Sequence, residues 1–71
     1  MPIDYERLEK DFTYHAPKDN QSAKYEMIRS DAKDFARMVM DFCPPSRETS
    51  LALTKIEEAV FWANAAIARN E

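Results

Sequence analysis

The sequence of 71 residues predicts an all-α protein in which a short N-terminal arm or helix precedes an antiparallel two-helix hairpin. Glycine is absent, which disfavours the tight primed turns of β-hairpins and the glycine-rich loops that bind phosphate. Apolar residues recur every three or four positions along two long stretches, which is the helical period. Pro44 and Pro45 separate these stretches and cannot continue a helix. We therefore expect one domain, 1–71, divided into an arm (1–18), a first helix (19–42), a turn (43–46) and a second helix (47–70).

The arm opens with a weakly amphipathic segment, residues 4–10, that is expected to form a turn or a short helix. Tyr5 and Leu8 share one face of this segment. A helix of this length persists in water only when it docks on another element. Its stability is therefore expected to depend on the rest of the protein.

An aromatic stretch, "DFTYHAPKDNQ" (residues 11–21), follows and is expected to be irregular. Pro17 disfavours helical backbone at the residue before it, and the Asp-Asn pair after it favours a turn or a helix start. Phe12 is expected to anchor the arm against the helices. Tyr14 and His15 are expected to form the part of the arm that contacts a ligand.

The two long helices are defined by their caps and their apolar faces. The first is expected to begin near Asp19 or Asn20, either of which can act as the N-cap, and to end near Phe42. Its apolar face contains Tyr25, Ile28, Ala32, Phe35, Val39 and Phe42. Ser46 is the expected N-cap of the second helix. The apolar face of that helix contains Leu53, Ile56, Val60, Ala63 and Ile67. Two long helices joined by so short a turn form an antiparallel hairpin.

The second helix carries more apolar residues than one face requires. Phe61, Ala65 and Ala68 lie roughly opposite its apolar face, and Trp62 points to a flank. A helix that is apolar on every side is usually buried on every side, and a single partner helix cannot cover it. Self-association would bury the surplus, since the small alanines allow a close approach of helices. The alternative is that the arm folds over one side and the rest stays exposed.

Composition and charge exclude several classes of function. The formal net charge of −3 argues against DNA, RNA and membrane-surface binding. No segment approaches the roughly 20 apolar residues needed to cross a bilayer. Cys43 is the only cysteine, and the N-terminal residues lack the basic and apolar runs of a signal peptide, so a cytoplasmic protein is expected. The sequence contains neither the motifs of common enzymes nor a usual zinc-ligand set, so we expect no catalysis, no cofactor and no metal.

A basic stripe runs along the first long helix. Arg29, Lys33 and Arg37 are spaced four residues apart and so lie along one side of it. The stripe is either solvated, with nearby aspartates relieving the repulsion, or part of an anion site. Arg29 lies one turn after Tyr25, in the half of the helix closest to the aromatic stretch. An aromatic ring beside a guanidinium suits a ligand that combines a flat base with a phosphate.

Two further residues each have a structural and a ligand-binding interpretation. Arg69 lies in the last turn of the second helix, where its positive charge interacts favourably with the helix dipole. The alternative is that several copies of Arg69 converge in a symmetric oligomer and form a second anion site. His15 either tethers the arm through a hydrogen bond or lies beside a phosphate that favours its charged form. The residues alone leave these alternatives open.

Four segments, taken in order, carry a family resemblance: "FTYHAP", "YEMIR" followed by Lys33, "CPPSRETSLALTKIEEA" and "WANAAIARN". Together they cover nearly the whole chain from Phe12 to Arg69, and the chain resembles a family of small viral and prophage counter-defence proteins. Members of this family are helical-hairpin sponges that sequester cyclic oligonucleotide signals. They block CBASS, the cyclic-oligonucleotide-based antiphage signalling defence, and the same hairpin occurs in a sponge that blocks Thoeris.

The resemblance implies a compact homohexamer that binds ligands and catalyses no reaction. Cyclic dinucleotides are then expected between two protomers, and cyclic trinucleotides at separate sites. Tyr14 resembles the tyrosine that stacks on a base, Arg29 stands where a lysine contacts phosphate, and Arg69 resembles the arginine of the trinucleotide site. His15 stands where family members have an arginine, and the glycine of their "GYR" segment is missing here. These differences bear on which ligand is preferred, because arginine and lysine differ in geometry and reach.

The expected ligand-binding residues are Tyr14, His15, Arg29, Lys33 and Arg69. The expected function is to bind and sequester cyclic dinucleotides, and also cyclic trinucleotides at a second site, without cleaving them. If the protein is viral, this takes place in the cytoplasm of the host cell. The alternative is a helical, homo-oligomeric protein-interaction module that has no small-molecule ligand and uses its exposed helix surfaces to bind another protein.

Overall fold

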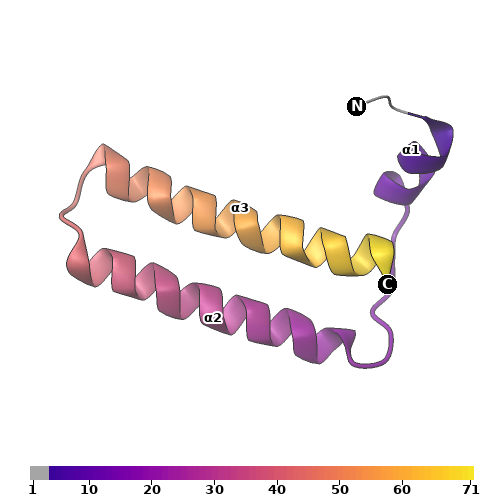
Figure 1. The fold of residues 1–71 in the computed structure, drawn as a ribbon, viewed down its shortest axis with the longest axis horizontal. Helices are drawn as coiled ribbons and strands as arrows, with labels where there is room; N and C mark the ends of the chain where they lie inside the picture. The colour runs from indigo at the N-terminus through magenta and orange to yellow at the C-terminus, as the bar shows by residue number, and fades with distance from the viewer. Residues whose placement is uncertain (1–3) are drawn as a thin grey trace.

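The computed structural model describes residues 4–71, and the first three residues of the predicted arm lie outside the described part. Three helices follow one another: α1 (Tyr5–Phe12), α2 (Gln21–Phe42) and α3 (Arg47–Asn70). No strand occurs within residues 4–71, so the predicted all-α class is confirmed. The helices α2 and α3 lie side by side and antiparallel, whereas α1 turns away beside the C-terminal end of α3 (Figure 1).

The short helix α1 is held by a cap and by polar contacts with the hairpin. Asp4 is its N-cap, and the Asp4 carboxylate accepts a hydrogen bond of 2.7 Å from the backbone N–H of Arg7. Lys10 Nζ donates to Asn70 Oδ1 at the end of α3, over 2.8 Å. The helix continues through Phe12, farther than the segment predicted to be helical. These polar contacts dock α1 on the hairpin and so stabilise a helix that is too short to persist alone in water.

The expectation that Phe12 anchors the arm is wrong for the described chain. Phe12 ends α1 with 83% of its surface exposed. Tyr5 and Leu8, on the same side of α1, are exposed as well. The contacts that dock α1 on the end of α3 are made by its polar side chains Lys10 and Asp11.

The irregular segment after α1 leads into α2 through a turn. Residues 13–18 have no regular secondary structure, and Asp19 takes the left-handed conformation with φ 47°. Aspartate tolerates this conformation better than most residues, so the turn forms without glycine. Asn20 occupies the N-cap position of α2, but its side chain makes no capping hydrogen bond. Instead, Gln21 Oε1 accepts from the backbone N–H of Lys18 at 3.0 Å, and the Gln21 N–H donates to the Lys18 carbonyl at 2.8 Å.

The turn between α2 and α3 is closed by backbone and hydroxyl groups. Ser46 is the N-cap of α3, as predicted, and its Oγ accepts from the backbone N–H of Thr49 at 3.1 Å. The Thr49 hydroxyl donates to the Pro44 carbonyl at 2.7 Å. The Cys43 N–H donates to the Val39 carbonyl at 2.9 Å and ends α2. These bonds make the reversal tight and bring the two long helices together.

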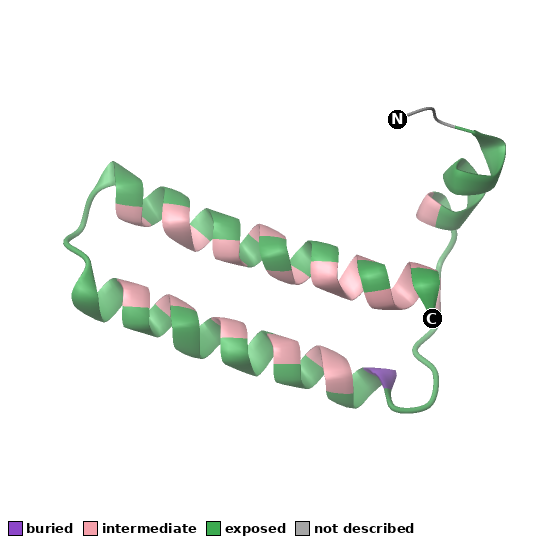
Figure 2. Ribbon diagram, viewed as in Figure 1, coloured by how far each residue is buried: buried purple, intermediate pink, exposed green. Residues whose placement is uncertain are grey.

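The two long helices pack along one face each, and Figure 2 shows their half-buried stretches turned toward one another. All five residues of the predicted apolar face of α3 are half-buried. In α2, Phe35 and Phe42 were expected on the inner face but are exposed, and Ala36 is half-buried instead. A straight helix drifts by about 20° per seven residues relative to a strict heptad, which carries successive heptad positions such as Phe35 and Phe42 out of the contact.

This packing makes a thin molecule with a seam and no enclosed core. Among residues 4–71, no apolar residue is buried, and the single buried residue is Gln21, with 3% exposure. The radius of gyration is 15.4 Å and the extents are 44 × 31 × 15 Å. A compact domain of this length has a radius of gyration of about 11 Å. Phe61 and Trp62 remain exposed on α3. None of the described helices is long and apolar enough to span a membrane.

Polar contacts around Gln21 close the end of the hairpin at which α2 begins and α3 ends. Gln21 Nε2 donates to Glu71 Oε1 at 3.2 Å, and Lys24 Nζ pairs with Glu71 Oε2 at 2.6 Å. Lys18 Nζ donates to the main-chain oxygen of Glu71 at 2.9 Å. The hydrogen bond from Lys24 and then that from Gln21 lower the pKa of Glu71 below its ordinary value of 4.5. These contacts hold the irregular segment beside the end of α3.

Candidate functional site

A cavity of about 400 Å³ lies where the irregular segment meets the two long helices. This volume is in the range of small-molecule sites. Its lining comes from the arm (Asp11, Thr13, Tyr14 and His15), from the N-terminal half of α2 (Tyr25 and Arg29) and from the last turns of α3 (Asn64, Ala65, Ala68 and Arg69). These segments come together because the antiparallel hairpin places the beginning of α2, and the arm before it, beside the end of α3.

Four of the five predicted ligand-binding residues line this cavity: Tyr14, His15, Arg29 and Arg69. The fifth, Lys33, does not, because it lies one turn farther along α2, roughly 6 Å along the helix axis. Tyr14 and Arg29 of the same chain thus line one cavity. Arg69, which was expected at a separate site, lines the same cavity as Tyr14.

Tyr14 presents an exposed aromatic ring at this cavity. Of its surface, 84% is exposed, and its hydroxyl makes no hydrogen bond to any residue in 4–71. Ala65 and Ala68 of α3 line the same cavity and carry no bulky side chain that could fill it. The ring is therefore accessible to a flat ligand group on which it can stack.

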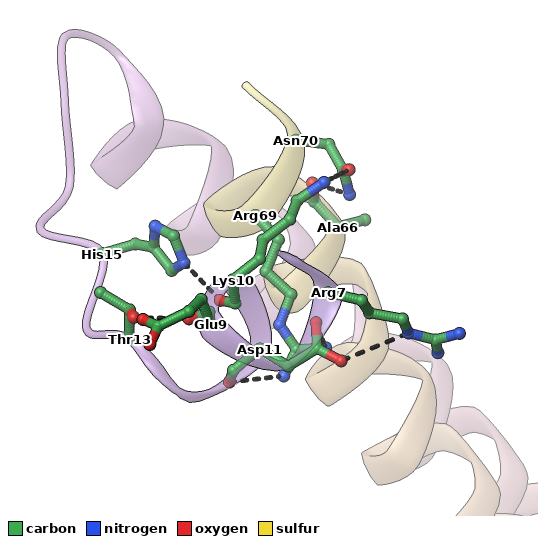
Figure 3. A network of polar contacts seen from close by, with 9 residues as sticks. All are labelled: Arg7, Glu9, Lys10, Asp11, Thr13, His15, Ala66, Arg69 and Asn70. Atoms are coloured by element: carbon green, nitrogen blue, oxygen red, sulfur yellow. Dashed lines mark hydrogen bonds and ion pairs between the residues drawn. The ribbon is translucent and has the colours of Figure 1, made fainter. Parts of the chain in front are cut away.

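His15 is half-buried and hydrogen-bonded within the arm. Its Nε2 lies 2.8 Å from the Lys10 carbonyl oxygen (Figure 3). A carbonyl only accepts, so Nε2 carries the proton in this contact. The Thr13 hydroxyl also donates to a carbonyl of α1, that of Glu9. Both bonds fold the irregular segment back against α1. His15 therefore tethers the arm, as its structural interpretation expects, and its ring also lines the cavity.

The basic stripe of α2 is solvated and carries no internal counter-charge. Arg29, Lys33 and Arg37 are exposed, and none forms an ion pair within the described range. The neighbouring aspartates that could have relieved the stripe, Asp31, Asp34 and Asp41, form no ion pair with it. The Arg29 guanidinium is therefore available to an anion at the cavity.

Arg69, in contrast, is already paired. Its Nη1 lies 3.6 Å from Asp11 Oδ1, and its Nη2 lies 3.5 Å from the Asp11 main-chain oxygen. The other carboxylate oxygen, Oδ2, lies 3.5 Å from Nε of Arg7, so Asp11 connects two arginines, as Figure 3 shows. The Arg69 and Asp11 side chains are 31% and 26% exposed. This pair attaches α1 to α3 at the edge of the cavity.

Three polar residues of the cavity were not foreseen from the sequence: Asp11, Thr13 and Asn64. Asp11 gave no signal, because its contact with Arg69 joins positions 58 residues apart. Asn64 did give one, since it interrupts the apolar, alanine-rich stretch "WANAAIA". Its Oδ1 is shielded from solvent and has no hydrogen-bond partner among residues 4–71.

Taken together, the cavity combines two tyrosine rings, of which that of Tyr14 is exposed, two guanidinium groups, one carboxylate and one amide. Such a set can bind a ligand that has a flat aromatic part and negative charge. No cluster of three or more His, Cys, Asp or Glu side chains that could hold a metal ion occurs in the part of the chain that the structure describes.

Comparison with known proteins identifies one related family. A family model described as "Acb2/Tad1, hairpin domain" matches residues 4–68, which is nearly the whole chain. No curated protein and no solved structure matches the chain.

Proposed function

Because the chain belongs to the Acb2/Tad1 hairpin-domain family, we propose that it binds cyclic oligonucleotides and sequesters them without cleavage. This is the family of anti-CBASS and anti-Thoeris sponges, which are binding proteins rather than enzymes. By removing the signal, the protein would counter CBASS-type antiphage defence. The strongest support is that Tyr14, His15, Arg29 and Arg69 line one cavity although they come from three separate segments.

The chemistry of the cavity fits a nucleotide that carries phosphate. A base can stack on the exposed ring of Tyr14. The unpaired guanidinium of Arg29 can form charge-assisted hydrogen bonds to a phosphate. Two arginines face one aspartate here, so the local charge favours an anion although the chain as a whole is acidic. Sequestration requires affinity alone, so base stacking and charge pairing suffice and no catalytic group is needed.

We further propose that the protein works as a homo-oligomer, a hexamer according to the family resemblance. The support is that no apolar residue is buried within residues 4–71. Phe61 and Trp62 of α3 are exposed, as are Tyr5 and Phe12 of α1. Exposed apolar surfaces of this extent are typical of interfaces. A neighbouring protomer would cover them and would enclose a cyclic dinucleotide between two chains, as the family resemblance implies.

A ligand-release experiment tests the proposed function. The purified protein is mixed with a panel of cyclic dinucleotides and trinucleotides, freed of unbound ligand, and heated. The released material is analysed by mass spectrometry, and native mass spectrometry counts the subunits. Release of intact ligand is the expected result. Release of cleaved ligand would identify an enzyme instead, and failure to retain any member of the panel would refute the proposal.

A second candidate function rests on the exposed pair Phe61 and Trp62, which are adjacent on α3. In this alternative the protein is an interaction module whose helix surface binds another protein, and the basic stripe serves solubility alone. It predicts that Trp62→Ala abolishes partner binding, whereas Tyr14→Ala and Arg29→Ala change little. Pull-down experiments with the three variants, run beside the ligand-release experiment, distinguish the two functions.

A further inference from the structure

The irregular segment between α1 and α2, residues 13–18, is attached on both sides to the same end of α3. On the side of α1, the Asp11 carboxylate pairs with Arg69 over 3.6 Å. On the side of α2, Glu71 accepts hydrogen bonds from three side chains, those of Lys18, Gln21 and Lys24. The segment that carries Tyr14 is thus a strap, held at its two ends by the last turn of α3.

Gln21 connects this strap to Glu71 with both ends of its amide. Its Oε1 accepts from the backbone N–H of Lys18 at 3.0 Å, and its Nε2 donates to Glu71 Oε1 at 3.2 Å. Gln21 is 3% exposed and is the single buried residue within 4–71. An amide is costly to bury unless its hydrogen bonds are made, and an apolar side chain of similar size carries no such cost. The amide at this position therefore serves to fix the backbone at Lys18.

A fixed backbone at Lys18 restricts where Tyr14 can lie. Only three residues separate the two, and one of them is Pro17, whose ring limits the backbone angles there and at the residue before it. Burial does not hold the ring of Tyr14, because 84% of its surface is exposed. Gln21 and Glu71 do not line the cavity, so they can influence a ligand there only through the strap.

We propose that Gln21 and Glu71 are positioning residues, which hold the strap so that Tyr14 stands at the cavity before a cyclic dinucleotide arrives. This inference rests on the proposed function, because the ligand is the same. A ligand that meets an ordered segment does not have to order it on binding, and its affinity is higher for that reason. The two residues thus raise affinity without touching the ligand.

A double-mutant cycle tests whether Glu71 acts through the ring of Tyr14. Glu71→Ala, Tyr14→Ala and the double variant are compared with the wild type, with cyclic di-AMP and cyclic di-GMP as probes. Thr49→Ala is the control for stability, because the Thr49 hydroxyl bonds the Pro44 carbonyl at the other end of the hairpin, outside the cavity. Calorimetric titration below the melting temperature of each variant gives the dissociation constants, and native mass spectrometry counts the subunits.

The expected result is a loss of affinity that depends on the ring. Glu71→Ala should bind roughly threefold to tenfold more weakly, the effect of ordering one side chain on binding. In the Tyr14→Ala background, the same substitution should change affinity less than about twofold. Thr49→Ala should melt at a lower temperature and bind as the wild type does. Without ligand, amide hydrogen exchange in residues 13–21 should be faster in Glu71→Ala and unchanged in Thr49→Ala.

Exchanging the two side chains tests the contact between positions 21 and 71 itself. Gln21→Glu alone places two carboxylates against each other, so it should loosen the strap and weaken binding. The double variant Gln21→Glu with Glu71→Gln restores a donor opposite an acceptor and keeps the net charge. It should bind within about twofold of the wild type. A double variant as weak as Gln21→Glu alone would show that this contact does not position the strap.

The remaining outcomes separate this inference from the proposed function. An unchanged affinity of Glu71→Ala, or an equal loss with and without the Tyr14 ring, would overturn the inference while the proposed function stands. An equal loss in Thr49→Ala would assign the effect to stability, and a changed subunit number would assign it to assembly. Either would also overturn the inference. A wild type that binds neither probe would overturn it together with the proposed binding of cyclic dinucleotides.

Discussion

Asp11 of α1 lies 3.6 Å from Arg69 of α3, measured from Oδ1 to Nη1, at the edge of the candidate cavity. The pair has two consequences. It attaches the N-terminal helix to the hairpin, because α1 has no buried residue that would hold it there. It also occupies one of the two guanidinium groups that could bind a phosphate, so a ligand anion at Arg69 competes with the Asp11 carboxylate.

Replacing Asp11 by asparagine should therefore strengthen the binding of cyclic oligonucleotides. Asp11→Asn removes the competing charge and leaves Arg69 free to pair with phosphate. The gain should be about 0.5–1 kcal/mol, as expected for a partly exposed pair, and should shrink with added salt. Calorimetric titration at two salt concentrations measures it. Glu26→Gln on α2 removes one negative charge outside the cavity and is the matched control. Equal gains in the two variants would mean that net charge alone is responsible.

Arg69→Ala tests whether cyclic trinucleotides use a site distinct from that of cyclic dinucleotides. If several copies of Arg69 converge in the oligomer, the variant should lose about 1.5–3 kcal/mol of trinucleotide binding and much less dinucleotide binding. The variant also leaves the Asp11 carboxylate unpaired, so the double variant Asp11→Asn with Arg69→Ala is measured beside it. Similar losses for both ligand classes in the double variant would show a single shared site, in line with the one cavity that Arg69 and Tyr14 line.

Tyr14→Ala should weaken dinucleotide binding by about 1–3 kcal/mol, the usual effect of removing a ring that stacks on a base. The melting temperature without ligand should hardly change, because the ring is exposed and unbonded. Met40→Ala is the control, since Met40 is an exposed apolar residue of α2 outside the cavity. Fluorescence or calorimetric titration provides the comparison. If Tyr14→Ala retains full affinity, Tyr14 has no part in ligand binding.

The basic stripe of α2 should show a gradient of effects along the helix. Arg29→Ala should cost about 1.5–3 kcal/mol of binding free energy, since Arg29 lines the cavity and has no ion-pair partner among residues 4–71. Lys33→Ala should cost less, because Lys33 lies one turn away, and Arg37→Ala should cost least. All three variants remove one positive charge, so each controls for the others. Equal losses would indicate a general electrostatic effect instead of a contact at Arg29.

The closed end of the hairpin should weaken in acid because of Glu71. Its pKa is below 4.5 in the folded state, through hydrogen bonds from Lys24 and Gln21, so its contribution to stability is complete above pH 4.5. The contribution is lost as the pH falls below 4.5 through the lowered folded-state value. The melting temperature, measured by circular dichroism, should therefore fall more steeply with pH in this range for the wild type than for Glu71→Gln. Glu57→Gln, which changes an exposed glutamate without an ion pair within residues 4–71, should behave like the wild type. Parallel curves for wild type and Glu71→Gln would contradict this account.

The sequence identified several residues of the candidate site, but it did not predict how they are arranged. Tyr14 and Arg29 followed from residue type and spacing, and the family resemblance implied their roles. Their presence at one cavity depends on the path of the irregular segment, which hydrogen bonds of His15 and Gln21 direct. Arg69 was expected at a different site, because nothing in its local sequence shows that α3 ends beside the arm.

The sequence by itself determined the secondary structure of the chain: the two long helices, the proline-containing turn between them and the Ser46 cap. These are local properties that depend on residues within a few positions of one another. Tertiary structure alone decided that Phe12 and Phe35 face solvent, that Asp11 pairs with Arg69, and that Asn64 Oδ1 has no hydrogen-bond partner within residues 4–71. Such features depend on the rotation of one helix against another and on where a distant segment docks. Small angular drifts along a helix decide them, and no local pattern records those drifts.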